Sequence, residues 1–163
     1  MPQSIFISYR RADSQHATFA IADRLRWAFG NDEVFFDRGS IRAGNEWPAS
    51  LRHGLESAKA LVVVIGREWL KTADDWGRRR IDDPRDWVRL EICTGLARRR
   101  DDKLAIIPIL LAGAQRVRAE ALDAPLQGLA EIEPLSLDDD HWENGIERLI
   151  AGIVDSVVVI GVV

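Results

Sequence analysis

Short, almost continuous apolar runs alternate along this chain with longer amphipathic segments. Runs of Val, Ile, Leu and Phe without alternating polar positions are typical of strands that are covered on both faces. The strand-like runs are residues 4–8, 34–36, 61–65, 104–110 and, less clearly, 131–135. The helix-like segments are residues 14–29, 48–57, 86–98 and 140–154. Ser14 is a good N-cap for the first helix, and Gly30 is a natural stop.

This alternation of strands and helices predicts a flavodoxin-like, doubly wound α/β domain with a five-stranded parallel sheet. Right-handed crossovers would place helices on both faces of that sheet. Residues 66–84 are polar and rich in Trp and Arg, so we expect a long irregular excursion outside the core. We expect one domain over residues 1–155, followed by an apolar tail, residues 156–163, whose role the sequence leaves open.

Composition narrows the class of protein. A net charge of −4 argues against a dedicated nucleic-acid binder, and acidic residues flank both arginine triplets (78–80 and 98–100), as on solvated surfaces. The single cysteine, Cys93, excludes an internal disulfide framework and fits a reducing compartment. It is expected to be a small core residue. The apolar tail is shorter than the about 20 residues that a membrane helix needs, so no membrane span is expected. Together with the cysteine usage and a strand-like start in place of a secretory signal, this predicts a cytoplasmic protein.

The chain lacks the residues that several reactions of α/β domains require. No GxGxxG follows a strand, and the chain contains neither a GxxxxGK[ST] phosphate loop nor a GxSxG nucleophile turn. The strand ends lack the acids of a two-component receiver. The three histidines stand singly, and one cysteine cannot complete a metal-ligand cluster, so no metal is expected.

Ligands of open parallel sheets bind beyond the carboxyl ends of the strands. That rule selects residues 8–11, residues 37–47 and the segment that leads into the helix containing Trp87 and Glu91. These two side chains stand four residues apart and therefore share one face of the helix. Any helix contains such pairs, so a surface Glu91 paired with Arg89 or Arg98 is the competing interpretation.

Five motifs, in order over roughly residues 4–153, resemble those of TIR (Toll/interleukin-1 receptor) domains. FISYRR (6–11) resembles the first strand and the loop after it. VFFD (34–37), together with SIRAG (40–44) and Trp47, resembles the second strand and the loop after it. DWVRLEI (86–92) is similar to the WxxxE helix of NAD-cleaving members. IPI (107–109) resembles the fourth strand, and Trp142 the tryptophan before the last helix. The second loop and the WxxxE helix look most like bacterial and NAD-hydrolysing animal members.

The resemblance implies cleavage of the nicotinamide–ribose bond of NAD+, giving nicotinamide with ADP-ribose or a cyclic ADP-ribose isomer. Glu91 would be the catalytic carboxylate, because bond cleavage places positive charge on the ribose and a nearby carboxylate stabilises it. The resemblance implies NAD+ as the substrate, with no permanently bound cofactor, and activity that depends on self-association.

The same resemblance implies a set of substrate-binding residues: Ser8, Tyr9, Arg10, Asp37, Ser40, Ile41, Gly44, Trp47 and Trp87. Arg10 could meet a phosphate or be a plain exposed arginine. Asp37 could bind a ribose hydroxyl or cap the next turn. Trp47 could close the pocket or pack on the following helix, and Trp87 could line the pocket, cover the sheet, or do both.

Two classes of function therefore compete. One is an NAD+-consuming enzyme of bacterial immune or toxin-like signalling, and the other is a TIR–TIR interaction module without chemistry. Fold alone does not choose between them. The acid of WxxxE favours the enzyme, since a pure adaptor does not need it.

Overall fold

The computed structural model describes residues 4–37, 47–101 and 103–159, with the side chains of 157–159 left aside. Five parallel strands form one sheet in the order β2-β1-β3-β4-β5. The strands are β1 (Ile5–Tyr9), β2 (Val34–Phe35), β3 (Ala60–Ile65), β4 (Ala105–Leu111) and β5 (Leu135–Leu137). This is the flavodoxin-like order, and the predicted fold class is confirmed.

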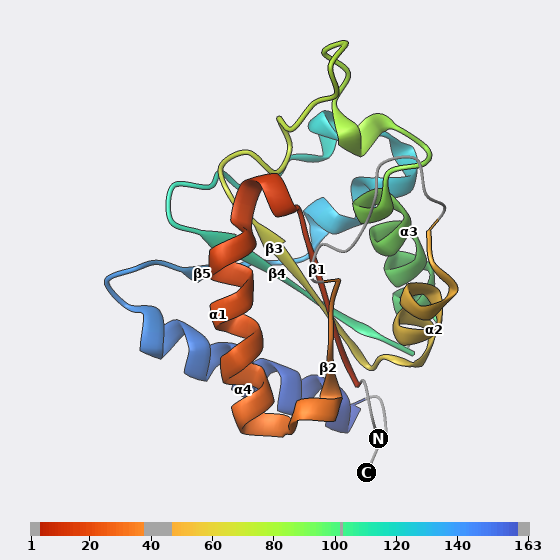
Figure 1. Ribbon diagram of the computed structural model, residues 1–163. Coiled ribbons are helices and arrows are strands. Elements are labelled where there is room, and N and C mark those ends of the chain that lie inside the picture. Colours follow the sequence, from red (N-terminus) through yellow and green to blue (C-terminus); the bar gives the residue numbers. More distant parts are fainter. Residues whose placement is uncertain (1–3, 38–46, 102, 160–163) are drawn as a thin grey trace.

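The sheet separates two pairs of helices (Figure 1). The helices are α1 (Arg11–Phe29), α2 (Ala49–Ser57), α3 (Trp87–Arg100) and α4 (Trp142–Val159). Helices α1 and α4 cover one face and α2 and α3 the other, so that two apolar clusters form. The short 3-10 helices are η1 (Asn31–Glu33), η2 (Arg80–Asp82), η3 (Ala119–Ala121) and η4 (Ala124–Glu131). Among the described residues, no helix combines the length and apolarity that crossing a membrane requires.

The alternation of side chains along β1 decides what each residue can reach. Phe6 belongs to the apolar cluster beneath α2 and α3, whereas Ile5, Ile7 and Tyr9 belong to the cluster beneath α1 and α4. Successive side chains of a strand point to opposite faces, so Ser8 lies on the same face as Phe6. The carboxyl end of β1 therefore presents Ser8 to α3.

The starts of two elements differ from the prediction by three residues or more. Helix α1 begins at Arg11, with Arg10 at its N-cap, and Ser14 is a kink inside it at φ −145° and ψ 31°. The Ser14 hydroxyl is buried and has no hydrogen-bond partner within the described residues, so it does not cap the helix. The fifth strand begins at Leu135, because the preceding residues up to Glu131 form η4, which packs against α3.

The excursion after β3 is partly core, and the expectation that it lies outside the core is wrong. Trp69 and Ile81 are 0% and 1% exposed, in the cluster beneath α2 and α3. Burying two large side chains holds both ends of this segment against the domain. The residues between them project from the upper end of the sheet in Figure 1.

Gly95 of α3 gives a direct test of this packing. A Cβ at Gly95 would lie 2.4 Å from Cδ2 of Leu61, which is fully buried. We expect Gly95→Ala to lower the free energy of unfolding by about 1–3 kcal/mol, because overpacking outweighs the helix propensity of alanine. Gly152→Ala in α4 is the matched control, since its Cβ would meet Ile107 at an ordinary 3.9 Å. Chemical denaturation should show that control unchanged or stabilised by up to about 1 kcal/mol.

Candidate active site

Helix α3 brings Glu91 over the carboxyl end of β1. Asp86 is the N-cap of this helix, and its side chain accepts a hydrogen bond of 3.0 Å from the Arg89 backbone N–H. Glu91 follows in the next turn and is only 6% exposed. The predicted candidate is thus an interior group. The competing interpretation of a surface acid is wrong, because Arg89 binds Asp123 and Arg98 binds carbonyls of α2 and its C-terminus.

Ser8 is the hydrogen-bond partner of Glu91 within the described part of the chain. Its Oγ donates to Oε1 of Glu91 over 2.8 Å, and Ser8 is 0% exposed. Burial raises the pKa of Glu91 from 4.5 to about 8, because the charged form loses its hydration. The Ser8 hydrogen bond and the Arg10 guanidinium oppose this rise, while the carboxylates of Asp86 and Asp37 add to it. A carboxyl poised near neutral pH is a feature of functional sites.

A buried ion pair lies beside this carboxyl. Arg10 donates from Nη1 and Nη2 to the two carboxylate oxygens of Asp86, at 3.0 and 2.8 Å. The two side chains are 6% and 9% exposed. The idea of a plain exposed Arg10 is therefore wrong. The pair joins the end of β1 to the start of α3, and together with the Ser8–Glu91 bond it gives the two elements two polar links.

Two of the expected substrate contacts lie on the other side of the sheet or at its rim. The Tyr9 ring packs edge-on against Phe19 and Phe36, at 6.3 and 6.1 Å between ring centres, in the α1–α4 cluster. Its hydroxyl donates to the backbone carbonyl of Asp37. Tyr9 thus points away from Glu91 and holds the ends of β1 and β2 together. Asp37 lies at the same rim, and its carboxylate is near enough to Glu91 to raise the pKa of that group.

The two predicted tryptophans both pack against the α2–α3 cluster and are partly buried. For Trp87 this agrees with the expectation that it covers the sheet. The Trp47 ring lies beneath the Arg52 guanidinium, 5.6 Å from it, which matches packing on the following helix. The Trp47 Nε1 atom is buried and has no hydrogen-bond partner within the described residues. The remaining predicted residues, Ser40, Ile41 and Gly44, lie outside the described residues.

Asp13 is a structural residue of the site that the sequence did not reveal. Its two carboxylate oxygens accept hydrogen bonds of 2.8 Å from the backbone N–H groups of Gly66 and Glu68. The loop after β3 is thereby tied to the first turn of α1. The partners are more than 50 positions apart in the chain, so no local motif announces this contact.

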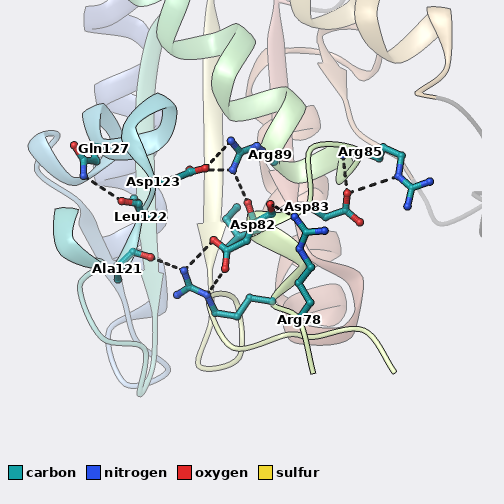
Figure 2. A network of polar contacts seen from close by, with 11 residues as sticks. Arg78, Asp82, Asp83, Arg85, Arg89, Ala121, Leu122, Asp123 and Gln127 are labelled. Carbon is teal, nitrogen blue, oxygen red and sulfur yellow. Dashed lines mark hydrogen bonds and ion pairs between the residues drawn. The ribbon is translucent and has the colours of Figure 1, made fainter. Parts of the chain in front are cut away.

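The arginine triplets are not simply solvated, which corrects that expectation for two of their members. Arg79 bonds both carboxylate oxygens of Asp82 at 2.8 and 3.0 Å and the Ala121 carbonyl at 2.8 Å (Figure 2). Arg98 donates to the carbonyls of Leu55 and Ala58 at 2.6 and 2.7 Å. Both side chains join segments that are distant in sequence.

Arg89 extends the Arg79–Asp82 contact into a network around the start of α3. It donates to both carboxylate oxygens of Asp123, at 2.9 and 2.8 Å, and to the Ile81 carbonyl at 3.0 Å (Figure 2). The Arg89 side chain is 12% exposed. The network therefore fastens the excursion and the segment before η4 to the helix that contains Glu91.

The described residues also show the surroundings of Cys93 and of the possible metal ligands. Cys93 is half-buried against the core, and burial raises the pKa of its thiol, which keeps it protonated. Within residues 4–37, 47–101 and 103–159, no three His, Cys, Asp or Glu side chains are grouped to hold a metal ion. Among the described acidic residues, Glu91 is the one that is buried as a whole residue, at 6% exposed.

A parallel sheet with a buried, raised-pKa carboxyl at its strand ends defines an α/β domain with a candidate site at that edge. The TIR domain family model matches residues 5–150. The chain belongs to the TIR domain family.

Solved structures share the fold. The TIR domains of the activated Roq1 resistosome, which directly recognises the pathogen effector XopQ, align at a TM-score of 0.59 with 14% identity. The alignment covers 94% of this chain and 98% of that chain. A metazoan TIR-STING receptor from C. gigas, in complex with 2',3'-cGAMP, aligns at 0.57 with 18% identity. That alignment covers 91% of this chain but 39% of the receptor. No curated protein matches the chain.

Proposed function

We propose that this TIR domain cleaves the nicotinamide–ribose bond of NAD+, with Glu91 as its catalytic carboxylate. The observation that carries the proposal is the position of Glu91, buried at the end of β1 and hydrogen-bonded to Ser8 at 2.8 Å. Its chemistry matches the reaction, in which the electrons of the C1'–N bond leave with neutral nicotinamide. Positive charge then develops on the ribose, where an adjacent carboxylate stabilises it.

The protonation of Glu91 fits a substrate that is itself a cation. With a pKa of about 8, the group is mostly neutral at pH 7 in the free domain. The positively charged nicotinamide ring favours the ionised form on binding, because an opposite charge nearby lowers a carboxyl pKa. Water then adds to C1' and releases a proton, which yields ADP-ribose. Attack by an adenine nitrogen in place of water would give a cyclic isomer.

The structure changes the role proposed for Arg10. A phosphate contact would require its guanidinium to leave Asp86, with which it forms two hydrogen bonds. We therefore assign Arg10 to holding α3 on β1. Asp37, Trp47 and Trp87 remain proposed contacts, together with Ser40, Ile41 and Gly44, which lie outside the described residues. The signalling context proposed from the resemblance is bacterial immune or toxin-like and cytoplasmic.

The alternative is a TIR interaction module without chemistry. Burial of Glu91 speaks for the enzyme, since a buried ionisable group destabilises the fold and a scaffold gains nothing from it. Self-association is compatible with both functions, and we propose that the active form is an assembly of several copies.

Incubation of the purified domain with NAD+ tests the proposal. We expect nicotinamide to appear together with ADP-ribose or a cyclic isomer, at a rate per molecule that rises with protein concentration. Mass spectrometry of the products measures both activity and product class. Unchanged NAD+ at concentrations where sedimentation shows assembled protein would favour the scaffold.

A further inference from the structure

The excursion after β3 contains a small hairpin, residues 73–79, that is held together by its own hydrogen bonds. Ala73 and Arg79 form an antiparallel bridge, and the Asp74 N–H donates to the Arg78 carbonyl at 2.8 Å. The Asp74 side chain accepts hydrogen bonds from the backbone N–H groups of Trp76 and Arg78 at 2.9 and 3.0 Å. Gly77 takes the turn at φ +82°. The hairpin thus has a defined shape despite its exposure.

Trp76 stands at the tip of this hairpin and is 93% exposed. The base of the hairpin is held by the Arg79–Asp82 pair, by the Arg89–Asp123 pair that Figure 2 shows, and by the buried Trp69 and Ile81. A large aromatic ring on a preorganised support binds a partner with little loss of conformational freedom. Trp76 therefore has the exposure and the rigid support expected of a residue that anchors a protein–protein interface.

The chain on both sides of Trp76 has more exposed cations than exposed acids. The exposed cations of the excursion outnumber its exposed acids, Glu68 and Asp75. The cations are Arg67, Lys71, Arg78 and Arg80, of which the last three stand within five positions of Trp76 in the chain. Arg80 directly follows the bridge residue Arg79, and its backbone N–H donates to the Thr72 carbonyl at 2.8 Å. A partner for this tip should present acids around a space that accepts an indole ring.

Such a surface exists on the same chain, at the β5 edge of the sheet. An open groove of about 600 Å³ lies between β5 and α4. Its polar lining includes Ser136, Asp138, His141, Asn144, Glu147 and Arg148. Asp139 and Asp140 are exposed next to the lining residue Asp138, so this end of the groove is acidic, while the nearby Glu143 is paired with Arg24. The Glu147 carboxylate can accept an indole N–H, as can the second oxygen of Asp138, whose Oδ1 accepts from the His141 backbone N–H at 2.8 Å.

We propose that the Trp76 hairpin of one copy docks into the β5–α4 groove of a second copy. Opposite charge and an aromatic anchor facing an open groove together favour this contact. The hairpin tip and α4 lie at opposite ends of the view in Figure 1, so one molecule cannot satisfy both surfaces itself. Joining unlike surfaces makes a head-to-tail contact, which propagates into rings or filaments. The proposal does not depend on the chemistry proposed above.

Sedimentation velocity without NAD+ tests the contact separately from any activity. We expect the unmodified chain to form a concentration-dependent series of oligomers that 0.5 M salt weakens. Trp76→Ser should weaken association at least tenfold, as should the groove variant Asp138→Lys/Glu147→Lys. Trp27→Ser is the matched control, because Trp27 is also exposed, at 82%, but lies on α1. It should associate like the unmodified chain.

Mixing the two defective variants gives the sharpest readout. Each retains the surface that the other has lost, so an equimolar mixture should form one intact contact and stop at a 1:1 dimer. Arg80→Glu should likewise weaken association and recover it with Asp138→Lys. The proposal is overturned if the unmodified chain stays monomeric at its highest soluble concentration, or if Trp76→Ser associates normally. Failure of the mixture to dimerise also overturns it, as does Trp76-dependent binding to anionic lipid vesicles without self-association.

Discussion

Glu91→Gln is expected to reduce nicotinamide release from NAD+ at least about a hundredfold while the domain stays folded. Glutamine keeps the size of the side chain and an oxygen that can accept the 2.8 Å hydrogen bond from Ser8. It removes the negative charge that stabilises the developing cation on the ribose. Product release measured by chromatography tests this, with Glu133→Gln, an exposed acid paired to Arg116, as the control.

The same substitution should make the domain more stable at alkaline pH. The folded state raises the pKa of Glu91 from 4.5 to about 8, so between these values the folded chain keeps a proton that the unfolded chain releases. The contribution of Glu91 to stability is therefore complete below pH 4.5 and is lost as the pH rises through 8. The slope is about 1.4 kcal/mol per pH unit, which over this window amounts to several kcal/mol.

Urea unfolding between pH 5 and 9 measures this effect. We expect Glu91→Gln to gain stability relative to the unmodified chain as the pH rises, whereas Glu133→Gln should follow the unmodified chain. A loss of activity together with a gain of stability is the signature of a group kept for function. Parallel stability curves for the two glutamine variants would contradict the buried, proton-binding Glu91. Full activity in Glu91→Gln would remove it from catalysis.

The sheet was predictable because its strands are nearly continuous apolar runs. Residues 61–65 contain only Leu, Val and Ile, and the strand they predict is β3, with all its side chains buried. The rule that ligands bind at strand ends also selected the edge of the sheet at which Ser8 and Glu91 meet. Side chains alternate along a strand, so the consecutive residues Ser8 and Tyr9 point to opposite faces of the sheet. The Tyr9 ring accordingly lies on the face away from α3.

Other features depend on contacts that local pattern does not contain. Arg10 and Asp86 are 76 positions apart, so an exposed arginine and a buried pair look alike in the sequence. Trp69 and Ile81 are buried inside a polar segment, because two apolar anchors among many charges leave no periodic signal. Asp13 in the first turn of α1 is a third example, because its carboxylate accepts hydrogen bonds from Gly66 and Glu68, which follow β3 in the chain.

Breaking the Arg10–Asp86 pair should strongly destabilise the domain. In Asp86→Ala the Arg10 guanidinium stays buried without its carboxylate, which typically lowers the free energy of unfolding by about 3–5 kcal/mol. Loss of the N-cap of α3 adds about 1 kcal/mol. Chemical denaturation measures the loss. Glu133→Ala, which removes an exposed partner of Arg116, is the control and should cost under about 1 kcal/mol.

The double variant Arg10→Met/Asp86→Leu separates the missing charge partner from the missing contact. With both charges removed, no uncompensated ion remains, and much of the stability lost in Asp86→Ala should return. The Ser8–Glu91 link would still join β1 to α3. A double variant as unstable as Asp86→Ala would show that the geometry of the pair, not its charge balance, holds the two elements together. A single variant that loses under 1 kcal/mol would show that water reaches Arg10, contrary to its burial.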